Sequence, residues 1–233
     1  MKIPRVICHM ATAVNGRILT ANWGDENIVK KFSALYEKCH QSFNSQAWMC
    51  GRVTMEKDFA SDEPPQLVTP PNPITREPFI GNKQATSFAI AIDGKGKLGW
   101  DDNEINGDHI IEVLSDEVSD EYLYYLQQKN ISYLFAGKKQ LDFALALQQL
   151  ATLFPIKTIM LEGGGYLNGS MLNAELIDEL SILLLPIADG AEKTQTTFEV
   201  SDYLPERPAS LMKLARVEQL EHDVLWLNYQ LNQ

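Results

Sequence analysis

Several features that define other protein classes are missing from this 233-residue chain or scarce in it. It has three cysteines, Cys8, Cys39 and Cys50, and none is spaced as C-x-x-C, which excludes a disulfide framework and predicts free thiols in a reducing compartment. Its most apolar run, Leu180 to Ala188, is far shorter than the ~20 residues of a membrane helix. The N-terminus also lacks the unbroken apolar core of a signal peptide. We therefore expect a cytoplasmic protein with no membrane partner.

Positive charge is scarce as well. Lys and Arg number 20 against 31 Asp and Glu, which gives a formal net charge of −11. Such a chain is repelled by phosphate backbones, so we expect no nucleic-acid partner. Small phosphorylated ligands are not excluded, because a few amides and one or two cations can form a local positive site.

The motifs of covalent and metal catalysis are absent. The sequence has no G-x-S-x-G, no H-E-x-x-H and no H-x-E with P-C-x-x-C. Two adjacent Cys-His pairs, at 8–9 and 39–40, are poor chelators, because neighbouring side chains on a strand point to opposite faces. We therefore expect no metal.

The chain does have the composition of a globular protein, with 45% apolar and 22% charged residues. Its hydrophobic periodicity alternates between strand and helix. The predicted strands are 5–11, 47–50, 88–93, 110–114, 131–136, 158–161 and 180–185, and the predicted helices are 27–40, 53–59, 121–129, 141–153 and 167–174. Two late stretches, 211–220 and 224–231, predict an antiparallel pair. We expect an α/β fold over a single domain, 1–233, with a mixed, mostly parallel sheet and antiparallel C-terminal strands.

One segment fits neither pattern. Six of the eleven prolines lie between Pro64 and Pro78, a density that excludes a helix or a central strand. A surface loop and a lid over a binding site are equally compatible with this composition.

The sharpest motif is the segment Ile159 to Gly169, in which an apolar strand runs through three glycines into a helix start. Glycines there allow a ligand to approach the backbone, and free amides at a helix N-terminus attract anions. The spacing is neither G-x-G-x-x-G nor a P-loop. A tight turn without a ligand is the alternative. Glu162 ends the strand, where a carboxylate could bind an amino-substituted ring or move a proton, or simply pair with a surface cation.

Two shorter motifs are weaker by themselves. Gly51 is followed by a helix start in which Thr54 and Asp58 lie one turn apart on the same face, although a helix cap and a solvated carboxylate explain them equally well. After the first strand, Asn15-Gly16 predicts a turn. Trp23 follows in a loop, where it either faces a ligand or packs.

Together these segments resemble a known family. The order is A-x-x-x-N-G-R-I at 11–18, G-x-x-T at 51–54 with Asp58, L-E-G-G-G at 161–165, and L-x-D-E-L at 176–180. It is similar to the pyrimidine reductase domain of riboflavin biosynthesis, the C-terminal half of the bifunctional deaminase/reductase. The resemblance implies a dihydrofolate-reductase-like three-layer sandwich and a homodimer. It also implies an NADPH-dependent reduction of the ribosylamino side chain of a 5′-phosphorylated aminopyrimidine to the ribitylamino form.

The same resemblance implies which residues bind the cofactor. Thr54 and Asp58 match positions on the nicotinamide side, Ser115 matches a polar residue near the adenosine end, and Trp23 matches a contact in the first loop. The turn that would hold the diphosphate comprises Gly163, Gly164, Gly165, Tyr166, Leu167 and Asn168.

On the substrate side, the resemblance assigns Glu162 to the substrate and places Asn15 beside it. Asp58 and Glu162 are both candidates for the catalytic acid. The family commonly has S-x-D-G where this chain has Ala13 to Gly16, and its D-[DN]-P after the second helix is replaced by the proline-rich segment. These departures leave two alternatives open: a reductase of the same fold acting on a pterin or carbonyl compound, and a non-catalytic nucleotide-binding protein.

Overall fold

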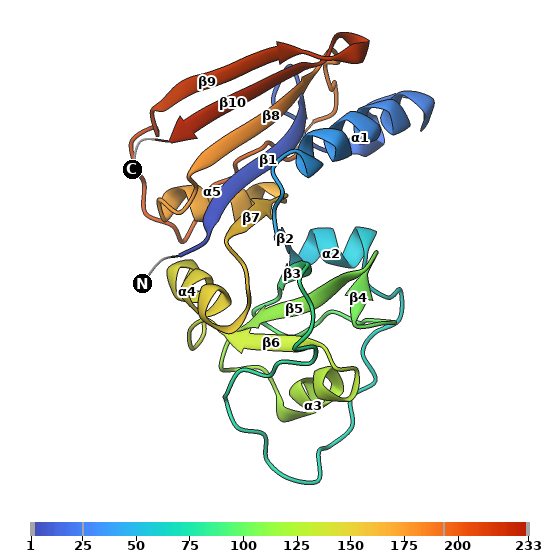
Figure 1. Cartoon of the computed structure of the whole chain (residues 1–233), viewed down its shortest axis with the longest axis vertical. Coiled ribbons are helices and arrows are strands. Elements are labelled where there is room, and N and C mark those ends of the chain that lie inside the picture. The colour runs from blue at the N-terminus through green and yellow to red at the C-terminus, as the bar shows by residue number, and fades with distance from the viewer. Residues whose placement is uncertain (1–2, 25, 193, 232–233) are drawn as a thin grey trace. The chain divides into compact units, whose positions relative to one another are not determined.

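The computed structural model describes residues 3–24, 26–192 and 194–231, and the chain forms two compact units (Figure 1). Of the described residues, the middle unit contains 3–4 and 46–159. The flanking unit contains the described residues of the ranges 5–45 and 160–231. Each unit has its own strands, helices and buried side chains. The expectation of a single domain over 1–233 stays a prediction.

The middle unit is built on a mostly parallel set of strands. β5 pairs in parallel with β3 and β6, β3 pairs in parallel with β2, and the short β4 runs antiparallel to β5. The strands are β2 (Ala47–Gly51), β3 (Phe88–Ile92), β4 (Glu104–Ile105), β5 (Asp108–Leu114) and β6 (Ser132–Phe135). The helices are α2 (Arg52–Asp58), α3 (Asp120–Gln128) and α4 (Phe143–Leu153).

The flanking unit has the strand order β1-β8-β10-β9 (Figure 1). β1 and β8 are parallel, whereas β10 is antiparallel to both β8 and β9. The strands are β1 (Arg5–Ala13), β8 (Glu179–Leu185), β9 (Met212–Gln219) and β10 (Leu225–Leu231). The helices are α1 (Glu26–Gln41), α5 (Gly165–Asn173) and the 3-10 turns η1 (Thr20–Asn22) and η2 (Glu221–Asp223). β7 (Thr158–Leu161) is the strand along which the chain passes from the middle unit into the flanking unit.

These elements confirm the predicted α/β class, with parallel strands dominating and an antiparallel pair at the C-terminus. Each predicted helix and strand is present with boundaries shifted by a few residues. β4 was not predicted, because two residues are too few to show a period of alternation. The three cysteines are free, as predicted, and the structure buries all three. No helix in the described ranges is long and apolar enough to cross a membrane.

The helices carry their own start signals. Ser119 caps α3 by accepting a hydrogen bond from Tyr122 N–H, and Asp142 caps α4 by accepting one from Leu145 N–H at 3.0 Å. α1 has an acidic residue in its first turn and basic residues in its last, which complements the helix dipole. Its buried stripe packs against Leu183, Leu185 and Trp226, so α1 covers one face of the flanking sheet.

The proline-rich segment has no helix or strand, as predicted, and it is anchored on α3. The Arg76 guanidinium donates to the Asp120 carboxylate at 2.6 Å and to the carbonyls of Asp116 and Val118. Ile74 packs against the core of the middle unit. The segment is therefore a fixed part of that unit's surface.

A buried carboxyl in β5 makes stability depend on pH. The Glu112 side chain is inaccessible to solvent, and its Oε1 accepts hydrogen bonds from Trp100 Nε1 at 2.5 Å and from Tyr122 OH at 2.8 Å. Burial, and secondarily the negative charge of Asp93, raises the pKa of Glu112 well above its usual range. The folded protein therefore favours the neutral acid, whereas the unfolded chain ionises near pH 4.5.

The stability that neutral Glu112 contributes is thus complete below about pH 4.5 and is lost as pH rises through the folded-state pKa. We expect Glu112→Gln, which cannot ionise, to be more stable than the wild type at pH 7. The difference in free energy of unfolding between the variant and the wild type should shrink toward pH 4 by up to about 1.4 kcal/mol for each pH unit. Urea unfolding of both proteins between pH 4 and pH 7 measures it, and a constant offset across that range would contradict the prediction.

Candidate functional site

The candidate site is the turn between β7 and α5, which lies in the flanking unit. Gly163 has φ +102°, a conformation that strongly favours glycine, and Gly164 occupies the N-cap of α5 in extended conformation. The peptide bond between them is cis. The chain thus turns from strand to helix within two residues, and no side chain caps the helix.

The backbone donors of this turn are available to a ligand. The N–H groups of Leu167 and Asn168 both bond to the Gly164 carbonyl, at 3.0 and 3.1 Å. Throughout the described chain, no acceptor faces the N–H groups of Gly163, Gly164, Gly165 and Tyr166. Adjacent free amides at the positive end of a helix form a site for an anion, and a diphosphate fits such a donor set.

The other side of α5 is closed by the segment 196–199. Glu199 N–H donates to the Gly165 carbonyl at 3.0 Å, and Asn168 Nδ2 donates to the Thr197 carbonyl at 3.0 Å. A Cβ on Gly165 would lie 2.4 Å from the Thr196 carbonyl oxygen, so this glycine is required by packing. Asn168 is fully buried, and its Oδ1 has no partner within the described ranges. The Asn168 side chain therefore joins α5 to the segment 196–199.

Glu162, the residue before the glycines, pairs with a histidine that sequence reasoning did not select. Its Oε1 lies 2.6 Å from Nδ1 of His40, in the last turn of α1. The two side chains are 14% and 20% exposed, so this is not a solvated surface pair. Nε2 of the same histidine faces Ser45 Oγ at 3.5 Å. No short-range signal links two residues 122 positions apart, which is why the sequence did not reveal the pair.

Asn15 and Trp23, the other predicted residues of the flanking unit, both have structural contacts. Asn15 Nδ2 donates to the Asp189 carbonyl at 2.6 Å, and its Oδ1 accepts from Asp189 N–H at 3.3 Å, which joins two loops. Trp23 is buried in the cluster that contains Phe32 and Trp226. Its Nε1 is buried without an acceptor among the described residues.

Thr54, Asp58 and Ser115 belong to the middle unit. Thr54 and Asp58 lie four residues apart on α2, with the Asp58 carboxylate 3.8 Å from Lys57 Nζ. Ser115 follows β5, is buried, and donates its hydroxyl to the Gly94 carbonyl at 2.6 Å. The predicted residues are therefore divided between the two units. The glycine turn and Glu162 both belong to the flanking unit. In the described ranges no group of His, Cys, Asp and Glu side chains could hold a metal.

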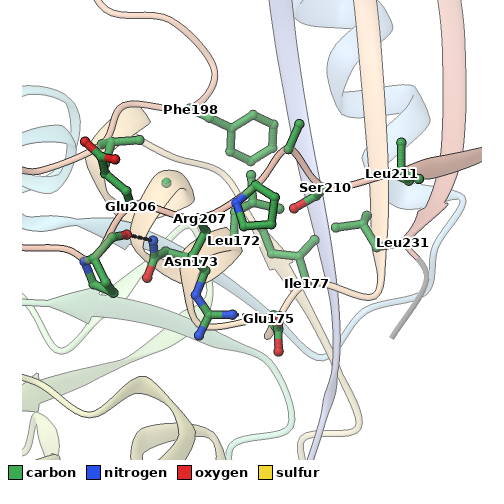
Figure 2. Close-up of a pocket in the computed structure, with 15 residues that line it drawn as sticks. Leu172, Asn173, Glu175, Ile177, Phe198, Glu206, Arg207, Ser210, Leu211 and Leu231 are labelled. Carbon is green, nitrogen blue, oxygen red and sulfur yellow. Dashed lines mark hydrogen bonds and ion pairs between the residues drawn. The ribbon is translucent and has the colours of Figure 1, made fainter.

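A cavity of about 830 Å³ lies at the other end of α5 (Figure 2). It is bounded by the C-terminal half of the helix, by the segment 198–211 and by Leu231. Arg207 and Glu175, which line it, form an ion pair at 2.6 Å. None of the residues predicted from the sequence lines this cavity, so it is separate from the glycine turn.

Comparisons with known proteins identify a consistent set of relatives. The family model described as the RibD C-terminal domain matches residues 4–226. A curated protein of Methanothermobacter thermautotrophicus, 2,5-diamino-6-ribosylamino-4(3H)-pyrimidinone 5′-phosphate reductase, is 30% identical over 98 residues. That match covers 42% of this chain and 45% of the relative, so it spans less than half the length of either protein.

Solved structures share the fold at low identity. A pyrimidine reductase-like protein of Corynebacterium diphtheriae is 15% identical, with a TM-score of 0.64 over 99% of this chain and 92% of that one. The riboflavin biosynthesis reductase of Saccharomyces cerevisiae is also 15% identical, with a TM-score of 0.59 over 99% and 90% of the two chains. RibD of Acinetobacter baumannii, at 17% identity and a TM-score of 0.63, is matched over 58% of its length.

Proposed function

The chain belongs to the RibD C-terminal domain family, and from this membership we propose that it is an NADPH-dependent reductase of the riboflavin-biosynthesis type. The proposed reaction reduces the ribosylamino side chain of a 5′-phosphorylated aminopyrimidine to the ribitylamino form. The observation that carries the proposal is the β7–α5 turn. There, four consecutive N–H groups that lack an acceptor within the described chain follow directly on the Glu162 carboxylate.

The residues present fit the cofactor. Bound NADPH would supply the hydride, and the protein would supply placement and exclusion of water. The amides of Gly163 to Tyr166 would hold the diphosphate, and Thr54 and Asp58 are proposed for the nicotinamide side. Ser115 is proposed for the adenosine end, although its hydroxyl already donates to the Gly94 carbonyl.

For the substrate, the proposal rests on Glu162 and on the relatives. The Methanothermobacter protein is named for a ribosylaminopyrimidine 5′-phosphate. Glu162 is a half-buried carboxylate next to the anion site, where it can accept hydrogen bonds from an aminopyrimidine ring or deliver a proton. Asn15 is proposed beside the substrate, with its side chain engaged by Asp189.

A second candidate function is the reduction of another small molecule, such as a pterin or a carbonyl compound. The proline-rich segment favours it, since this segment stands where the family carries a substrate-side motif and is fixed to α3 by Arg76. Nucleotide binding without catalysis is a third possibility. It requires that Asp58→Ala and Glu162→Ala leave the protein's function unchanged.

Two measurements test the function. Saturating NADPH should raise the melting temperature, because a ligand that binds only the folded state stabilises it by about 2.7 kcal/mol at 100 times its Kd. NADPH absorbance should then fall when the ribosylaminopyrimidine 5′-phosphate is added. Absence of any melting shift with NADPH and NADH would contradict cofactor binding. A shift with turnover only on a pterin or carbonyl substrate would select the second candidate.

We also propose a cytoplasmic homodimer in which β9 lies at the interface. β9 is the edge strand of the flanking sheet, and its neighbourhood exposes Leu211, Leu214 and Val217. Exposed apolar side chains on an unpaired edge favour association with a second copy. The free, buried thiols support a reducing compartment.

Sedimentation equilibrium should give twice the chain mass of 26.2 kDa. Leu214→Lys should shift the equilibrium toward the monomer, because it places a charge in the apolar interface, whereas Gln219→Lys on the same strand serves as the charge control. A wild-type monomer at micromolar concentration would contradict the proposal.

A further inference from the structure

The environment of Glu162 contains two histidines, and only one of them is positioned to carry a proton. His9 in β1 is held on both ring nitrogens: its Nε2–H donates to the Tyr36 carbonyl at 3.2 Å, and its Nδ1 accepts from the Ser181 hydroxyl at 2.9 Å. The Tyr36 carbonyl can only accept a hydrogen bond, so the proton of the His9 ring lies on Nε2. Ser181 Oγ in turn accepts from Trp226 Nε1 at 2.8 Å. His9 is thus completely bonded as a neutral ring.

The physical setting of His9 agrees with this assignment. Its ring stacks on Tyr36 with a centroid distance of 4.2 Å, and it is fully buried. Burial lowers the pKa of His9 to about 4, against the opposing influence of the Glu162 carboxylate. His9 is therefore uncharged at pH 7. Its ring packs edge-on against the ring of His40, with a centroid distance of 6.2 Å.

His40, in contrast to His9, is hydrogen-bonded directly to Glu162. Its Nδ1–H donates to Glu162 Oε1 at 2.6 Å, and short distances are characteristic of charge-assisted hydrogen bonds. Glu37, one helical turn earlier, also feels this pair: burial and the Glu162 charge raise the pKa of Glu37, and His40 lowers it. On the β1 side, burial and the Glu162 charge raise the pKa of the Cys8 thiol, so it stays neutral. The carboxylates of Glu37 and Glu162 therefore both lie near His40.

We propose, on the basis of the function proposed above, that His40 is a positioning residue that holds the proton of the reduction and delivers it through Glu162. The reduction consumes one hydride and one proton. The anomeric carbon accepts the hydride, and its bond to the ring oxygen breaks with the electron pair staying on that oxygen. His40 Nδ1 passes its proton to the Glu162 carboxylate, the Glu162 carboxyl formed in this way gives a proton to the sugar oxygen, and solvent reprotonates His40.

His40→Asn separates the hydrogen bond from the proton, because the asparagine amide can donate from about the same place as Nδ1 but does not titrate. At pH 7 we expect kcat to fall about 100-fold, with the NADPH-induced rise in melting temperature unchanged. The falling limb of kcat against pH, which reports the proton on the pair, should move to lower pH by at least one unit. Unchanged kcat together with an unchanged limb would overturn the proposal.

His222→Asn is the matched control. His222 is exposed in η2 and has φ +59°, a conformation that asparagine tolerates, so the same substitution there should leave kcat and its pH profile unchanged. In a Glu162→Gln background, His40→Asn should cost no further activity, since the two residues act as one unit. An undiminished 100-fold loss in that background would mean that His40 does not act through Glu162, and would overturn the proposal.

A titration of the protein alone separates this inference from the proposed function. Histidine ring signals followed by NMR against pH should give His40 a midpoint more than one pH unit lower in Glu162→Gln than in the wild type. Equal midpoints would overturn the pairing. If the wild type reduces none of the acceptors tested, the proposed function fails, and the midpoint difference still decides whether the pair holds a shared proton.

Discussion

A carboxylate at position 166 should remove most of the affinity for NADPH while leaving the fold intact. Tyr166 is the second residue of α5, its side chain is 52% exposed, and its N–H is one of the four donors of the glycine turn. An acidic residue in the first turn of a helix is compatible with the helix dipole, so Tyr166→Glu should not lower the melting temperature. Its charge would, however, stand within a few ångströms of the bound diphosphate.

At such separations two like charges repel by about 3 kcal/mol near a protein surface, which corresponds to about 100-fold in Kd. We expect that loss for Tyr166→Glu in fluorescence titration with NADPH. Glutamine has nearly the same shape as glutamate but no charge, so Tyr166→Gln should bind NADPH with a Kd within about threefold of the wild type. Added salt should narrow the gap between the two variants, because it screens exposed charges. Equal affinities in Tyr166→Glu and Tyr166→Gln would place the diphosphate elsewhere.

Gly169→Ala should destabilise the protein strongly, although in an ordinary helix the same change stabilises. Gly169 is in the middle of α5, where alanine is favoured over glycine by about 1 kcal/mol. Here a Cβ would lie 1.8 Å from the carbonyl oxygen of Glu199, which is backbone and cannot rotate away. The segment 196–199 would have to move, which breaks the bonds from Glu199 N–H to Gly165 and from Asn168 to Thr197.

With two buried hydrogen bonds lost, the net cost should be about 3 kcal/mol. Urea unfolding measures it directly as a lower transition midpoint. Gly190→Ala is the control, since a Cβ there meets nothing within 4 Å and the backbone conformation is ordinary. A Gly169→Ala protein more stable than the wild type would show that segment 196–199 does not pack on α5 as described.

Local sequence patterns were sufficient where neighbouring residues determine the backbone. The apolar stripe of α1 predicted its start and end within one residue of the observed Glu26–Gln41. The three glycines after an apolar run predicted a strand-to-helix turn, and the structure has that turn with positive φ at Gly163. Two late apolar stretches predicted the antiparallel pair of β9 and β10. Each of these features repeats or ends within a few residues, so its signal lies in a short window.

The candidate site was predictable only in part. The sequence indicated Glu162 and the glycine turn, because both follow a strand end directly. It did not reveal His40 as the partner of Glu162, nor that the Asn168 side chain is buried and donates to the Thr197 carbonyl. Likewise, Glu112 lies in an apolar strand pattern that gives no sign of the Trp100 and Tyr122 donors.

From the residues alone, this chain's α/β class, the order of its elements and the position of its glycine turn were determined, since periodicity and glycine placement act on the local backbone. The tertiary structure alone decided which carboxylate meets which histidine, which glycines are required by a neighbouring segment, and which polar groups are buried. Those outcomes depend on side chains brought together from distant parts of the chain, and their packing has no counterpart in any short stretch of sequence.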